Sequence, residues 1–171
     1  MRYIIILVLS TFITSCNAQN VSKCNCATLL IPTQKMIPLY EKPNGKIIAK
    51  IINDTLKEDY YTLQITEQIK GFSFVRASAA IIDTTTKTGW IETKYLGIYS
   101  SVYSDTLKLF TQPDKKSKVK SVINNPPYDF LNVIDCKNGW IYIKYLDIDK
   151  KTKEGWLSPD NQCSNPYTTC N

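Results

Sequence analysis

The chain of 171 residues carries the same set of landmarks twice, and this repetition restricts its possible folds more than any other feature. The landmarks recur in the same order at an offset of about 70 residues: LYEKP at 39–43 with LFTQP at 109–113, GFSFV at 71–75 with GWIYI at 139–143, and GWI at 89–91 with GWL at 155–157. A chain with this self-similarity is predicted to form two copies of one small unit.

Within each copy the residue pattern is typical of short β-strands. Residues 72–75 and 140–143 are runs of β-branched and aromatic side chains, and residues 118–123 alternate polar with apolar side chains as a half-buried strand does. Asn44-Gly45 and Asn138-Gly139 are hairpin turn signals. No stretch keeps a helical period. About five short strands in about 60 residues predict a small barrel, because closure removes exposed strand edges.

Each copy resembles a bacterial SH3-like (SH3b) domain. The resemblance rests on an opening Leu-aromatic pair followed by a turn proline, a central Gly-aromatic strand and a late Gly-Trp strand, with GWIETKYL at 89–96 as the fullest match. The second copy departs from this pattern, because WLSP at 156–159 leads into a cysteine-containing tail. The expected fold class is all-β, with two tandem SH3-like barrels at 36–99 and 106–171.

The amino terminus is predicted to be a signal peptide over residues 1–15. Arg2 precedes an apolar run at 3–13 that is too short to span a bilayer. The run ends in Ile-Thr-Ser before Cys16, which resembles a bacterial lipobox. The resemblance implies a diacylglycerol on Cys16 and an acyl group on its new amine, which together give stable anchoring. The alternative is ordinary cleavage after Ala18.

Residues 16–35 are interpreted as a tether and residues 100–105 as a short join between the barrels. No acidic cluster follows Cys16, which favours a lipid-anchored, periplasm-facing protein of the bacterial envelope. Removing Arg2 lowers the formal charge from +6 to about +5. This mild charge and the export signal argue against a nucleic-acid partner.

The cysteines predict disulfides, because an exported chain meets an oxidising compartment. Without Cys16 five remain, so at most two bridges form: Cys24, Cys26, Cys136, Cys163 and Cys170. A bridge within Cys24-Asn25-Cys26 would be strained, so these two cysteines are expected to compete for one partner. Cys163 and Cys170 close on each other in one arrangement, and in another each reaches Cys136 or the Cys24/Cys26 pair.

We expect no enzymatic activity, cofactor or metal. The chain has no histidine, which excludes Cys-His and Ser-His-Asp nucleophilic machinery and imidazole-ligated zinc. The cysteines lack paired C-x-x-C spacing. Carboxylates such as Asp83, Glu92, Asp135 and Asp147 lie in turns or beside lysines, where solvated surface charge is the usual explanation.

Aromatic side chains are the candidate ligand-binding residues, because rings stack on sugars and hold extended peptides at low entropic cost. The candidates are Tyr40, Trp90 and Tyr95 in the first copy and Phe110, Trp140, Tyr142 and Trp156 in the second. Burial in the barrel wall is the competing interpretation, above all for Trp90 and Trp156. The lysine-rich stretches at 115–120 and 150–153 are interpreted as solvated hairpin charge.

The sequence therefore favours a non-catalytic envelope module that recognises peptidoglycan or wall peptide. Wall binding predicts rings clustered in a groove. The alternative is a protein that holds another envelope protein, which predicts a flat apolar patch. A third reading is an inhibitor of a wall-active enzyme, which predicts that the tail around residues 165–167 projects as one rigid loop.

Overall fold

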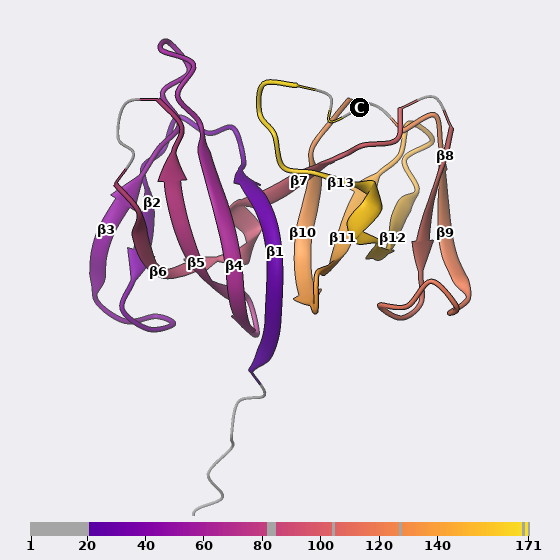
Figure 1. Cartoon of the computed structure of the whole chain (residues 1–171), viewed down its shortest axis with the longest axis horizontal. Coiled ribbons are helices and arrows are strands. Elements are labelled where there is room, and N and C mark those ends of the chain that lie inside the picture. The colour runs from indigo at the N-terminus through magenta and orange to yellow at the C-terminus, as the bar shows by residue number, and fades with distance from the viewer. Residues whose placement is uncertain (1–20, 82–84, 104, 127, 169, 171) are drawn as a thin grey trace, which may run out of the picture.

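The computed structural model describes residues 21–81, 85–103, 105–126, 128–168 and 170 (Figure 1). The described chain is all-β: thirteen strands form a single antiparallel sheet, with two short 3-10 helices, η1 (Thr93–Tyr95) and η2 (Pro159–Asn161). This confirms the predicted class. In the described part, no helix is long and apolar enough to cross a membrane. The predicted signal peptide and Cys16 lie outside the described residues.

Each half of the chain contributes five strands in the same spatial order. The first half runs β3-β2-β6-β5-β4 and the second runs β9-β8-β12-β11-β10. Their bounds are β2 (Ile37–Tyr40), β3 (Ile47–Ile51), β4 (Tyr61–Ile69), β5 (Phe72–Ala79), β6 (Lys87–Glu92), β8 (Thr106–Phe110), β9 (Val119–Asn124), β10 (Leu131–Lys137), β11 (Trp140–Leu146) and β12 (Thr152–Leu157). Figure 1 shows the two sets side by side. The sequence repeat is therefore a repeat of topology.

Three further strands join the halves: β1 (Ser22–Leu30), β7 (Leu96–Ser100) and β13 (Gln162–Cys163). β1 pairs with β4 and β7, and β7 pairs with β10, so one sheet runs from β3 to β9. β13 pairs with the far end of β7. Figure 1 shows β1 and β7 running between the two sets of strands.

Nine residues of the predicted tether over residues 16–35 form strand β1. Cys24, Cys26 and Thr28 alternate with exposed neighbours and face the interior, as in an ordinary half-buried strand. The period-two pattern was present in the sequence, but its inward positions carry cysteine and threonine. The segment therefore did not look like a strand.

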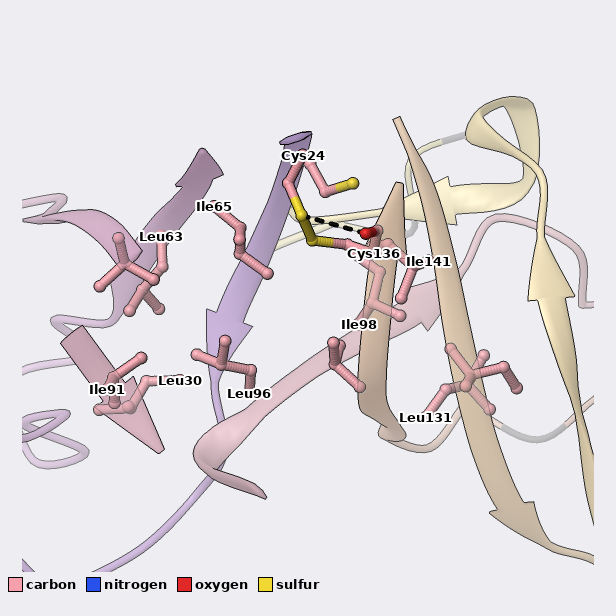
Figure 2. Close-up of a cluster of buried hydrophobic side chains, with 14 of the residues drawn as sticks. Cys24, Leu30, Leu63, Ile65, Ile91, Leu96, Ile98, Leu131, Cys136 and Ile141 are labelled. Carbon is pink, nitrogen blue, oxygen red and sulfur yellow. Dashed lines mark hydrogen bonds between the residues drawn. A yellow bond between two sulfur atoms is a disulfide. The ribbon is translucent and has the colours of Figure 1, made fainter. Parts of the chain in front are cut away.

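The hydrophobic core is aliphatic and continues from one half into the other. Ile65 and Ile91 in the first half connect through Leu96 and Ile98 of β7 to Leu131 and its neighbours in the second half (Figure 2). Each fully buried side chain of this size contributes about 1.5–3 kcal/mol relative to exposure. The junction is therefore packed like the interior of each half.

Two disulfides select among the pairings that the sequence left open. Cys24 on β1 bonds Cys136 on β10 across 112 residues, with Cα atoms 5.5 Å apart, and so links the two halves (Figure 2). Cys163 bonds Cys170 within the tail. Cys26 remains a free, buried thiol that donates to the Trp140 carbonyl, and burial raises its pKa.

Candidate functional site

Four aromatic rings stand on the face of the first half opposite to its aliphatic core. We call Tyr40, Phe72, Phe74 and Trp90 the first ring cluster. Strand register places Tyr40 beside Trp90 and Trp90 beside Phe74. The Phe74 and Trp90 centroids are 5.4 Å apart and those of Tyr40 and Phe72 are 6.1 Å apart, both edge to face. Edge-to-face contact is a favourable aromatic geometry and fixes the rings relative to one another.

The second half has its own cluster at the equivalent positions. We call Phe110, Trp140, Tyr142 and Trp156 the second ring cluster. Phe110 pairs with Trp156 in register, and Trp156 pairs with Tyr142. Edge-to-face contacts join Phe110 to Trp140 at 5.7 Å and Tyr142 to Trp156 at 5.4 Å. The two clusters therefore repeat both the residue positions and the ring geometry.

Six of the seven predicted ring positions fall in these clusters. The exception is Tyr95, on η1, which is partly buried against the core. The Lys94 ammonium lies over the Tyr95 ring, 4.9 Å from its centroid. Trp90 is only 9% exposed, so its ring serves mainly as wall, whereas the other rings of both clusters are half-buried. Phe72 and Phe74 were not among the predicted residues, although they occupy the repeat positions of Trp140 and Tyr142, a correspondence that identifies them.

Polar groups distinguish the second cluster from the first. Lys120 forms an ion pair with Glu154 at 2.7 Å, and the Tyr142 hydroxyl donates to the same carboxylate at 3.1 Å. Hydrogen bonds from Lys120 and Tyr142 lower the pKa of Glu154. The strand registers place Ile48 where the second half has Lys120, and Thr88 where it has Glu154. At these two positions the first half is therefore uncharged and the second half carries an ion pair.

A cavity of about 210 Å³ lies at the junction of the halves, and we call it the junction cavity. It is lined by Leu29, Leu30, Pro32, Asn53, Thr55, Tyr60, Tyr61, Tyr99, Phe130 and Pro166. Tyr99 is held between two other rings, with its centroid 4.8 Å from Tyr128 and 4.3 Å from Phe130. Sequence reasoning did not find this site, because its lining comes from segments far apart in the chain and no local pattern unites them.

The disulfide-closed tail packs against the cavity instead of projecting from the protein. Pro166 lines the cavity, and the Tyr167 ring contacts Tyr60 edge to face at 5.6 Å. The Tyr167 hydroxyl donates to the Glu58 carbonyl at 2.8 Å, which connects the end of the chain to a loop of the first half. Pro166 and Tyr167 thus hold the tail against the first half.

No protein-family model matches this chain, and no curated protein matches it.

Proposed function

We propose that this protein is a non-catalytic module of the bacterial envelope, anchored by lipid on Cys16, and that its two ring clusters bind peptidoglycan or wall peptide. We further propose that each half is an SH3-like unit. The shared order of five strands supports the second proposal. The apolar leader and the lipobox-like Ile-Thr-Ser-Cys support the anchor.

The observation that carries the binding proposal is the duplicated ring cluster on the face opposite to the core. Large aromatic residues usually fill the interior of small domains. Here the fully buried side chains of greatest volume are leucines and isoleucines, while Phe72, Phe110 and Tyr142 stay half-buried on the other face. Rings held at fixed angles present a rigid apolar surface that needs little ordering when a sugar or an extended peptide binds.

The test is co-sedimentation of residues 17–171 with purified peptidoglycan sacculi. Tyr40→Ala combined with Phe110→Ala removes one half-buried ring from each cluster, and we expect it to abolish pelleting. Leu146→Ala is the control, because Leu146 is 63% exposed on β11 and belongs to neither cluster. Pelleting that survives the double substitution would contradict the placement of the site. A folded protein that does not pellet would contradict wall binding itself.

A protein partner is the second candidate, and two exposed apolar side chains beside Tyr40 favour it. Ile47 and Ile48 are 46% and 51% exposed, and Ile47 pairs in register with Tyr40 of the first cluster. A contiguous exposed apolar patch is a mark of a protein interaction site. If the protein does not pellet with sacculi, photo-cross-linking from position 48 in envelope extracts is the experiment that follows. Cross-linking from position 120 in the second half is its matched control.

A further inference from the structure

We propose that the junction cavity binds a single uncharged sugar ring of a glycan chain, and that the disulfide-closed tail forms one wall of this site. The site is separate from both ring clusters, and the inference holds whether or not those clusters bind the wall. Four features of the cavity carry it: shared lining, absence of charge, the kind of polar groups present, and size.

Both halves are needed to build the cavity. Leu30 and Tyr60 belong to the first half and its β1 strand, whereas Phe130 and Pro166 belong to the second. Ligand sites concentrate at such boundaries between structural units, where a concave surface forms without interrupting either core. Because the β1–β7–β10 pairing and the Cys24–Cys136 disulfide fix the halves together, the walls are held in place before a ligand arrives.

Of the described residues that line the cavity, none is acidic or basic, although 21% of the chain is charged. A ligand with a carboxylate or an ammonium group would lose its hydration in this cavity without gaining a partner of opposite charge, which is strongly unfavourable. Wall peptides carry such groups, whereas the amino sugars of a glycan strand are acylated and neutral. The lining therefore selects a neutral ligand.

The polar groups in the lining are hydroxyls and one carboxamide, set among aromatic rings. Tyr60, Tyr99 and Thr55 supply hydroxyls. Burial raises the pKa of Tyr99, so its phenol keeps its proton and remains a neutral donor and acceptor. Aromatic rings and neutral hydroxyls in one lining match the amphipathic surface of a pyranose, which has apolar faces and hydroxyls at its edges.

Asn53 fixes the polar side of the cavity. Its amide nitrogen donates to the Leu30 carbonyl at 3.1 Å, and its amide oxygen accepts from the Tyr61 backbone N–H at 2.9 Å. Only 7% of its surface is exposed. Because both ends of the carboxamide are engaged, the side chain holds one orientation and works as a rigid wall.

The size of the cavity suits one ring. A volume of about 210 Å³ lies below the ~300 Å³ at which pockets take whole drug-sized ligands. A larger groove of about 570 Å³ adjoins it and shares Pro32, Asn53 and Thr55 with its lining. A glycan chain with one ring in the cavity can continue along this groove, which passes over the 53–56 turn.

The test is a heteronuclear NMR titration of residues 17–171 with triacetylchitotriose, a neutral amino-sugar trisaccharide. The tripeptide Ala-Glu-Lys, which is charged, is titrated in parallel. We expect the trisaccharide to shift the amide signals of residues 53–61 and 97–100, and the peptide to leave them unchanged. Shifts confined to the peptide, or no shift with the trisaccharide, would overturn the inference.

Two variants place the binding. Thr55→Trp fills the mouth of the cavity from an exposed turn position, and Tyr99→Phe removes one hydroxyl while keeping the ring. We expect each to weaken the trisaccharide by about tenfold or more, which is the range for losing one well-placed contact. Thr111→Trp, at an exposed position outside the cavity, is the matched control. Equal weakening by both tryptophan variants would overturn the assignment.

One comparison keeps this inference distinguishable from the proposed wall binding by the ring clusters. In the variant that carries Tyr40→Ala and Phe110→Ala, the trisaccharide is expected still to shift the amide signals of residues 53–61 and 97–100, whatever happens to signals at the ring clusters. If the shifts at residues 53–61 and 97–100 disappear in this variant, the sugar binds at a ring cluster and the junction cavity is not its site.

Discussion

The two halves of the protein share a backbone plan but differ in what surrounds it. Both keep the strand order, the positions of the ring clusters, and a glycine directly before the tryptophan of the late strand, Gly89 before Trp90 and Gly155 before Trp156. The second half adds the Lys120–Glu154–Tyr142 group, whereas the first has Ile48, Thr88 and Phe74 at those places. The ring positions and the close approach of the strands are therefore repeated, while the solvent-facing side chains beside the rings differ.

The two halves also differ where they meet. β1 and β7 hold equivalent places, because β1 pairs with β4 as β7 pairs with β10, but β1 has nine residues and β7 has five. The Cys163–Cys170 disulfide closes a tail at the end of the second half, and β13, where this tail begins, lies against β7 as β1 does. The junction cavity is lined in part by β1, by β7 and by this tail.

The largest expected effect separates the two disulfides. Replacing Cys24 and Cys136 together with alanine is expected to lower the free energy of unfolding by about 2–5 kcal/mol, because the bridge closes a long loop of the unfolded chain. Replacing Cys163 and Cys170 together should cost less, since their separation is 7 residues against 112. Urea denaturation of both variants measures the difference. Equal losses of stability would mean that the Cys24–Cys136 disulfide does not restrict the conformations of the unfolded chain more than the Cys163–Cys170 disulfide does.

The next effect tests whether both halves need their glycine equally. A Cβ at Gly155 would lie 2.9 Å from the Leu109 Cβ and 3.0 Å from the Phe110 oxygen, and φ at this glycine is 154°. At Gly89 the nearest atoms are at 3.1 Å. Gly89→Ala is therefore expected to cost about 1–3 kcal/mol, as overpacking does, and Gly155→Ala to cost more.

Thermal and urea denaturation of the two alanine variants measure this order. A variant at Gly71 is the control, because a Cβ there meets nothing within 4 Å and φ of 77° is the main cost. A smaller loss at Gly155 than at Gly89 would show that the second half relaxes around the new methyl group more easily than the first.

These glycines also show what the sequence could predict. The repeated Gly-Trp pair was visible because a close approach between strands constrains residue type at one position, whatever the rest of the chain does. The hairpin turns could also be predicted, because a turn position also restricts residue type. Asn44 and Asn138 adopt φ of 57° and 49°, which asparagine tolerates better than most residues. Six ring positions followed from the repeat.

The junction could not be predicted in this way. Whether Cys24 or Cys26 bonds Cys136 depends on which side chain meets β10 across a bulge in β1, and that is decided by packing over 112 residues of separation. The cavity depends on Tyr60, Tyr99 and Pro166 meeting in space. Local patterns in the sequence specify strands and turns, whereas contacts between distant segments carry no local signal.

A smaller effect tests the Lys120–Glu154 ion pair, in whose place the first half has Ile48 and Thr88. Glu154→Gln is expected to lower the free energy of unfolding near neutral pH by about 0.2–1 kcal/mol, the range for partly exposed ion pairs. Lys120 and Tyr142 lower the folded-state pKa of Glu154, so its stabilisation is present above the unfolded-state pKa and is lost as pH falls through the folded-state pKa.

Urea denaturation across the acidic range measures the effect of Glu154→Gln. The curves of the variant and the unaltered protein should converge at low pH and in high salt. Thr88→Val, at the equivalent place in the first half, should show neither dependence. A constant difference at every pH would mean that Glu154 stabilises through packing and not through charge.

The smallest expected effect concerns equivalent carboxylates at the β-bulges of β4 and β10. Glu67 is exposed, whereas Asp135 is half-buried beside the Cys24–Cys136 link, and burial raises its pKa. Because the folded-state pKa of Asp135 is raised, the protonated carboxyl favours the folded state. This contribution to stability is fully present below the unfolded-state pKa and is lost as pH rises through the folded-state pKa.

Asp135→Asn keeps an oxygen that accepts from the Cys136 N–H, so it should raise the stability slightly at neutral pH and leave it unchanged in strong acid. Glu67→Gln should change stability at neither pH. If the two variants behave alike in urea denaturation at both pH values, burial at the junction does not distinguish the halves electrostatically.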